Sequence, residues 1–285
     1  MKWTRSKLVL LFSISILLLL LSGPVLHQLA RNSHPGNQPL GHYNPIREAS
    51  NTTRTNGYAK QALIYDPLYR DHPNKTLYAI IIPLLKSNGY EVTVYAGRNA
   101  TLEPLVYMNG YSLVIIRAHG GYNNKSLGIY GRGEYIFTGL LYNEALSYYG
   151  DTIQRLVKKG ELAVGVVPPD NSGVTENELN ELPKQLVVSP LFIQHKTMLK
   201  KGAVIFVFSC YSMNDQTLAQ VFTGKGAAGV IGWRGGVTDR YMDAVLPIVV
   251  EEYVSKGLRG VERFIGENVL KDPVTGGELQ VYSGK

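Results

Sequence analysis

Cysteine is the scarcest residue in this 285-residue chain, with a single copy at Cys210. One cysteine excludes an intramolecular disulfide framework of the kind that stabilises many small secreted domains. In an exported protein an unpaired thiol is a chemical liability, so the presence of one suggests that it has a use. The alternative is that Cys210 is an inert buried thiol, which is a common state for cysteine.

The chain also lacks the short motifs by which proteins commonly bind nucleotides and metals. It has no phosphate-binding loop, no dinucleotide fingerprint and no metal-ligand spacing, so we expect no cofactor and no metal. The net charge is +7, from 29 basic and 22 acidic residues. No block of lysine and arginine is interleaved with aromatic residues, which argues against a nucleic-acid partner.

One long apolar run is present, and it lies at the N-terminus. Residues 8–26 are largely apolar and follow the basic residues Lys2, Arg5 and Lys7. This pattern is typical of a signal peptide or a signal anchor within residues 1–30, and the run is close to the ~20 residues that span a membrane. No clear cleavage site follows, so we favour an uncleaved anchor with the body exported. The expected location is the cell membrane, with the domain facing outward, or the exterior as a secreted protein.

The rest of the chain divides into a polar stretch and a folded body. Residues 31–57 are rich in Asn, Pro and Gly and lack an apolar period, as in a flexible stalk. Residues 58–285 are long enough for one domain with a full core. Strand and helix patterns then alternate as βαβαβ, which predicts a parallel sheet with right-handed crossovers. The predicted elements are strands at 62–65, 91–95 and 113–116 and helices at 76–87 and 102–108, the first helix being kinked or shortened at Pro83.

The pattern changes in the second half of the body. Residues 134–138 and 162–167 are typical of short strands and suggest a β-hairpin at the sheet edge. Residues 143–159 favour a helix interrupted at Gly150, and Ser189-Pro190 should begin a helix that runs to about Leu199. Further on, we expect a helix at 217–223, a strand at 229–233 and a long helix at 242–256.

Two of the predicted buried strands end in reactive side chains. The unbroken apolar run 203–208 ends at Ser209 and Cys210, and the strand at 113–116 is followed by His119, Gly120 and Gly121. Open α/β sheets build their sites at the carboxyl ends of parallel strands. If the two strands are neighbours, Cys210 and His119 would lie side by side, as a thiol nucleophile and its base require.

The order of these motifs resembles that of the caspase-like cysteine peptidases. The chain has, in order, a strand followed by His-Gly, a strand followed by x-Cys, and a strand that contains Gly-Trp. This order is closest in pattern to the CHAT, separase and gingipain branch. The stretch Gly232–Asp243 resembles the segment that follows the catalytic strand in separases and CHAT modules, and the resemblance covers about residues 58–270. It implies a three-layer α/β fold, with a mostly parallel central sheet flanked by helices, and a polypeptide substrate.

The resemblance also implies roles for particular residues. Cys210 would be the nucleophile that forms an acyl-enzyme, and His119 the general base or the acid that protonates the leaving amine. The family implies a dyad that needs no third carboxylate. The backbone N–H groups of Gly120 and Cys210 are the expected donors of the oxyanion hole.

Substrate specificity is expected to depend on an acidic side chain. Asp239 resembles the separase aspartate that binds the arginine before the scissile bond, so cleavage after Arg or Lys is expected. Asp239 could instead cap the helix that follows it, in which case Asp243 is the alternative and Asp215 a further candidate. Trp233 would form either a pocket wall or part of the core.

Two other functions fit the same residues. A catalytically inactive caspase-like module could serve as a surface scaffold or interaction module, and a thiol transpeptidase would use the same nucleophile. The intact His119 and Cys210 pair favours an active enzyme over the scaffold.

Overall fold

The computed structural model describes residues 60–123, 133–168 and 176–284, all within one compact unit that spans 53–285. The predicted signal or anchor segment at 1–30 and the predicted stalk at 31–57 lie outside the described residues. Within the described ranges, no helix combines the length and the apolar character needed to cross a membrane.

A six-stranded sheet forms the centre of the fold, in the order β12-β11-β10-β4-β1-β2. The strands from β11 to β2 are parallel to their neighbours, and β12 pairs with β11 in the antiparallel direction. The prediction of an α/β fold with a mostly parallel sheet is therefore confirmed. The bounds are β1 Lys60–Asp66, β2 Tyr90–Ala96, β4 Leu113–Arg117, β10 Val204–Phe208, β11 Gly229–Arg234 and β12 Glu278–Ser283.

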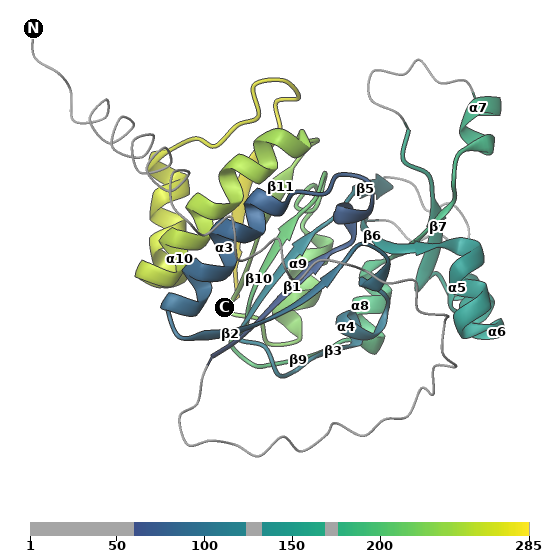
Figure 1. The fold of residues 1–285 in the computed structure, drawn as a ribbon, viewed down its shortest axis with the longest axis horizontal. Helices are drawn as coiled ribbons and strands as arrows, with labels where there is room; N and C mark the ends of the chain where they lie inside the picture. Colours follow the sequence, from purple (N-terminus) through teal and green to yellow (C-terminus); the bar gives the residue numbers. More distant parts are fainter. Residues whose placement is uncertain (1–59, 124–132, 169–175, 285) are drawn as a thin grey trace, which may run out of the picture. The chain divides into compact units, whose positions relative to one another are not determined.

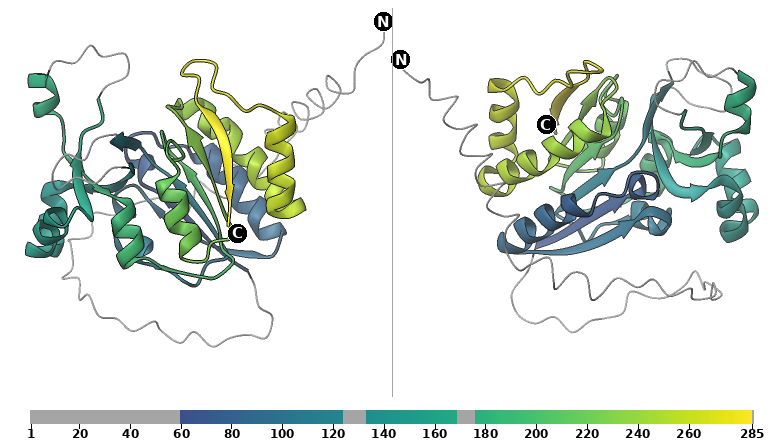
Figure 2. Two further views of the ribbon diagram at one scale, coloured as in Figure 1. Left: turned by 180° about the vertical axis from the view of Figure 1, so that it is seen from behind. Right: turned by 45° about the horizontal axis from the view of Figure 1, so that its top comes forward.

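Both faces of the sheet are covered by helices, which makes three layers (Figures 1 and 2). In β10, Ile205 and Val207 contact the core on one face, whereas Phe206 and Phe208 contact the core on the other. Burial on both faces explains why the strand is apolar throughout. One face is covered by α3 (Lys75–Ser87) and α10 (Asp239–Glu267), the other by α4 (Glu103–Val106), α8 (Pro190–Lys196) and α9 (Thr217–Gly224).

Several helix ends differ from the prediction. α3 keeps its predicted end at Ser87 and is not shortened at Pro83, but other helices end elsewhere. The helix expected at 102–108 ends at Val106, because residues 107–108 form β3 (Tyr107–Met108). The helix that begins at Ser189 ends at Lys196 rather than Leu199, because residues 198–199 form β9 (Met198–Leu199), which pairs with β3. α10 continues past residue 256, with a break in helical geometry at Gly257.

A second sheet of four strands lies beside the carboxyl edge of the central sheet (Figure 1). Its order is β5-β6-β8-β7, so the predicted hairpin between residues 134–138 and 162–167 is wrong: β8 lies between these two strands. The helix that follows β6 is interrupted at Gly150, as predicted. The bounds in this region are β5 Gly120–Asn123, β6 Gly133–Leu141, α5 Tyr142–Tyr149, α6 Asp151–Lys158, β7 Leu162–Gly165, α7 Glu176–Glu181 and β8 Gln185–Val188.

Candidate active site

β4 and β10 are adjacent parallel strands in the middle of the central sheet. Arg117, at the end of β4, is in register with Phe208, at the end of β10. The N–H of Ala118 donates to the carbonyl of Phe208 at 3.1 Å and extends this pairing beyond β4. His119 and Cys210 therefore follow the carboxyl ends of neighbouring strands, which confirms the predicted topology.

The backbone of Gly120 packs directly against the backbone of Cys210. A Cβ atom at position 120 would lie 2.1 Å from the Cys210 carbonyl oxygen and 3.0 Å from both the Cys210 nitrogen and the Cβ of Ser209. Only glycine permits so close an approach of two backbone segments. The glycine after His119 therefore holds the histidine segment against the cysteine segment.

The pairing of β5 with β6 sets the direction of the Gly120 N–H group. The N–H of Phe137 donates to the carbonyl of His119 at 3.1 Å, so these two residues form a hydrogen-bonded pair. Gly120 and Ile136 are the next pair along the ladder. Hydrogen-bonded and non-hydrogen-bonded pairs alternate in antiparallel sheets. The N–H of Gly120 therefore points away from β6 and is not used by this ladder.

The chain turns sharply immediately after Cys210. Tyr211 has a φ of 61°, in the left-handed region that bulky residues seldom adopt. Its N–H donates to the carbonyl of Gly235 at 2.8 Å, which holds this turn against the loop after β11. Strained backbone of this kind clusters at functional sites.

The Cys210 thiol is docked on the backbone of Val237. The sulfur accepts the N–H of Val237 and donates to its carbonyl oxygen, each at 3.3 Å. Burial raises the pKa of the thiol; the Val237 N–H opposes this rise, and the negative charges of Asp239 and Asp272 add to it. The thiol is therefore protonated at neutral pH.

His119 is largely buried, with 18% of its side chain exposed. Its ring lies edge-on to His72, at 5.6 Å between centroids, and to Phe137 at 6.2 Å. Nε2 is 3.6 Å from Oδ2 of Asp71, which is too long for a hydrogen bond. Burial lowers the pKa of His119, and the carboxylates of Asp239 and Asp71 only partly offset that effect. The imidazole is therefore neutral at neutral pH.

Asp239 is the first residue of α10, but it does not cap the helix. The cap is Thr238, whose side chain accepts the N–H of Tyr241. The carboxylate of Asp239 instead lies 3.0 Å from Nδ1 of His72 and is 31% exposed. Its charge acts on both His119 and Cys210, opposing the burial that lowers the pKa of His119 and adding to the burial that raises the pKa of Cys210.

Asp243 is occupied by a buried ionic network and is not free to bind a substrate cation. Arg117 is 1% exposed, and its Nε and Nη2 donate to Asp243 at 2.6 and 2.8 Å, while its Nη1 donates to Asp66 at 2.9 Å. Asn74 donates to Asp243 at 2.8 Å. Arg117 also donates to the carbonyl of His72 at 3.1 Å, so this network fixes the segment after β1.

Asp215 is likewise engaged within the protein. Its Oδ1 accepts the N–H of Thr217 at 3.1 Å at the start of α9, and it lies beside Glu134. Glu134 is buried and accepts the N–H groups of Asp215 and Leu218. Burial and the hydrogen bond to Asp215 raise the pKa of Glu134 to about 7. These contacts anchor the segment between Cys210 and α9.

Trp233 belongs to the core. Its side chain is fully buried and packs edge-on to Phe208 and Tyr241. Of the two interpretations of this residue, the structure therefore supports the core and gives no exposed surface for a pocket wall.

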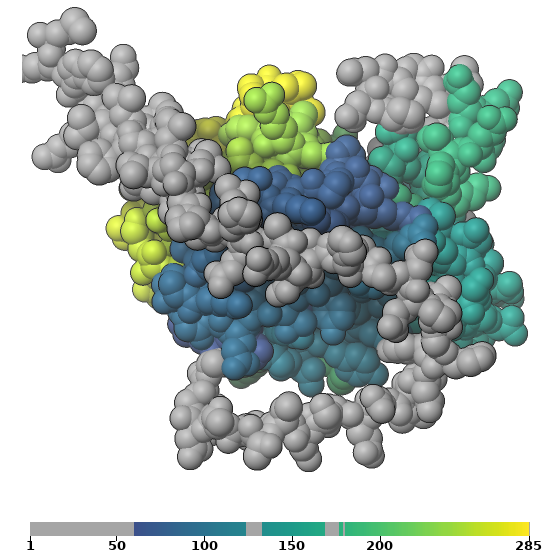
Figure 3. All heavy atoms as spheres, viewed as in Figure 1, coloured from purple at the N-terminus to yellow at the C-terminus, as the bar shows by residue number. Residues whose placement is uncertain are grey.

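Asp71 and His72 are the functional candidates that sequence reasoning missed. They follow β1 by five and six residues, and β1 is the neighbour of β4 in the sheet. Their position just past the carboxyl end of a central strand was the available signal. Figure 3 shows the blue-purple surface of this part of the chain, η2 (Pro67–Arg70) and α3, flanked by α10 in yellow-green.

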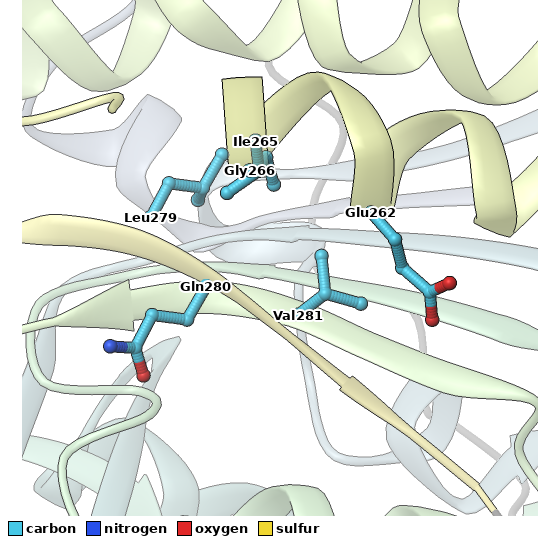
Figure 4. Close-up of a pocket in the computed structure, with 6 residues that line it drawn as sticks. All are labelled: Glu262, Ile265, Gly266, Leu279, Gln280 and Val281. Carbon is cyan, nitrogen blue, oxygen red and sulfur yellow. The ribbon is translucent and has the colours of Figure 1, made fainter. Parts of the chain in front are cut away.

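A separate hollow of about 340 Å³ lies between the second half of α10 and β12. Figure 4 shows Val281 pointing from β12 toward the helix that carries Ile265 and Gly266. Glu262, Leu279 and Gln280 complete its lining, and none of the predicted site residues contributes to it.

No protein-family model and no curated protein matches this chain.

Proposed function

We propose that this protein is a caspase-like cysteine endopeptidase whose dyad is Cys210 and His119. The observation that carries the proposal is the contact between the two strand ends, where Gly120 packs on the backbone of Cys210. This contact supports a thiol and an imidazole beside a backbone N–H that the β5–β6 ladder does not use, the set of groups that acyl transfer requires. The three-layer fold with its mostly parallel sheet agrees with the same family.

The mechanism begins from a neutral thiol and a neutral imidazole. The sulfur of Cys210 attacks the substrate carbonyl carbon while its proton passes to His119. The N–H groups of Gly120 and Cys210 stabilise the oxyanion. As the tetrahedral intermediate collapses, the C–N bond breaks and His119 gives its proton to the leaving amine. Water, deprotonated by His119, then hydrolyses the thioester and restores the thiol.

The substrate side chain before the scissile bond is proposed to be Arg or Lys. Asp239 supports this because its carboxylate is partly exposed and near both Cys210 and His119. A buried cation needs such a partner, since burial without one is costly. The exported, membrane-anchored location remains a prediction from residues 1–30.

The test is digestion of a peptide library by the wild type, with Cys210→Ala as the inactive control. We expect cleavage after Arg or Lys that the control lacks. Asp239→Asn should lower kcat/KM for those peptides by a factor that corresponds to roughly 2 kcal/mol of lost transition-state binding. This is near the lower end of the range for truncating one partner of a charge pair, because Asp239 is partly exposed. Equal loss on neutral peptides would instead assign Asp239 a structural role.

Two additions to this experiment, an acyloxymethyl-ketone label and an added amine, separate the two alternative functions. A scaffold would cleave nothing and would not be labelled at Cys210 by an acyloxymethyl ketone. A transpeptidase would join the acyl group to an added amine instead of releasing an acid.

A further inference from the structure

Asp239, the proposed acceptor of a basic substrate side chain, is already paired with a side chain of the protein itself. Its Oδ2 lies 3.0 Å from Nδ1 of His72. We propose that His72 occupies Asp239 in the ligand-free enzyme and that a basic substrate side chain displaces it. His72 is then a specificity-determining residue, because it sets the affinity for Arg and Lys. This inference rests on the proposed function.

The pair is accessible to a substrate. The side chain of His72 is 43% exposed and that of Asp239 is 31% exposed. Asp243, by contrast, is enclosed by Arg117 and Asn74. Of these two carboxylates on α10, only that of Asp239 is bound by a partner that can move into solvent.

The backbone of His72 is fixed while its side chain is not. Its N–H donates to the carbonyl of Leu68 at 2.8 Å, and its own carbonyl accepts a hydrogen bond from Arg117 at 3.1 Å. Displacement therefore requires only a side-chain rotation. The ring lies edge-on to His119 and does not contact it through a hydrogen bond that would resist rotation.

Asp239 is the carboxylate to which the ring of His72 is bonded. Asp239 faces it from α10, and Asp71 precedes it in the chain. The buried guanidinium of Arg117 is paired with Asp66 and Asp243. Its hydrogen bond to His72 goes to the backbone carbonyl and not to the ring. Nδ1 of His72 thus occupies the carboxylate oxygen Oδ2 of Asp239, to which a substrate Arg or Lys would bind in the proposed enzyme.

The first test measures KM and kcat for an Arg peptide with full-length variants. His72→Ala and His72→Gln should lower KM about two- to fivefold, as expected for the loss of a weak, partly exposed polar pair, and leave kcat unchanged. His72→Arg should raise KM on the order of tenfold, because it is always charged and binds carboxylates through two donors. His195→Ala is the control, since His195 is a similarly exposed histidine that pairs with a carboxylate on another element, the buried Glu161, at 3.1 Å.

The second test needs no cleavage. Binding of p-aminobenzamidine, a small arginine-like cation, is followed by its fluorescence on the full-length protein. It should bind more tightly to His72→Ala, more weakly to His72→Arg, and lose its affinity in Asp239→Asn. Circular dichroism melting of each variant checks that it is folded, and His72→Gln replaces His72→Ala if the latter does not fold.

Two results would overturn the inference. One is weaker binding of the cation to both His72→Ala and His72→Gln, which would mean that His72 assists the ligand. The other is a change in kcat with KM unaltered, which would mean that His72 acts on His119. Failure of the wild type to cleave any peptide would refute the proposed function, while the fluorescence titration would still decide the competition between His72 and the cation.

Discussion

Replacing Gly120 by alanine is the sharpest test of the contact between the two strand ends. The new Cβ would lie 2.1 Å from the Cys210 carbonyl oxygen, whereas ordinary contacts begin at 3.4 Å. One backbone segment must therefore move by roughly 1.3 Å. Misplacement of reacting groups by about 1 Å can cost about a hundredfold in rate. We expect a loss of that order in kcat/KM, together with about 1–3 kcal/mol of stability from overpacking.

Gly121→Ala is the matched control for this change. It alters the next residue of the same strand, where an added Cβ meets only Cε2 of Phe137, at 3.8 Å. That distance is an ordinary contact, so the control should keep both its melting temperature and its activity.

The assay combines peptide cleavage, the rate of labelling by an acyloxymethyl ketone and the melting temperature. Labelling reports on the site without a known substrate. If Gly120→Ala melts and reacts like the control, Gly120 does not hold His119 and Cys210 together, and the proposed site is wrong.

Two further predictions concern protonation. Because burial raises the pKa of Cys210, the rate of its alkylation by iodoacetamide should increase with pH and inflect above the usual thiol pKa of about 8.5. Asp239→Asn should move this inflection to lower pH. An inflection below pH 7 would contradict the neutral resting pair. Glu134 has a folded-state pKa raised by burial to about 7, so its stabilising effect is complete below its unfolded pKa and is lost as pH rises through about 7. Glu134→Gln cannot ionise, so it should flatten the decline in unfolding free energy over that window, although it keeps only one of the two acceptor oxygens. Equal pH dependence in both proteins would refute this.

The central sheet could be predicted because its strands carry a strong local signal. The run 203–208 is apolar throughout since both of its faces are buried, and a buried parallel strand requires that pattern. The same holds for residues 113–116, so the positions of His119 and Cys210 at strand ends followed from the sequence. Their adjacency was a condition of the dyad hypothesis and did not follow from the alternation of strands and helices, because the second sheet lies between β4 and β10 in the chain.

The four-stranded sheet could not be predicted, because its order depends on β8, a short strand that lies between β6 and β7. β8 has only four residues and begins with Gln185, so it carries little periodicity of its own.

The role of Asp243 was hidden for a different reason. Its partner Arg117 lies 126 residues away and is buried in a strand, a position that apolar residues usually fill.

In the proposed enzyme, the carboxylates near Cys210 and His119 would link substrate binding to the reactivity of the site. The negative charge of Asp239 raises the pKa of both His119 and Cys210, so it stabilises an imidazolium but disfavours a thiolate. A substrate Arg or Lys that replaces His72 on Asp239 would bring its positive charge beside the sulfur. The thiol proton would then leave more easily at the moment when the substrate carbonyl is in place, while Asp71 would still stabilise the imidazolium that receives it. In the proposed enzyme, recognition of a basic side chain and activation of the nucleophile would therefore depend on the same carboxylate.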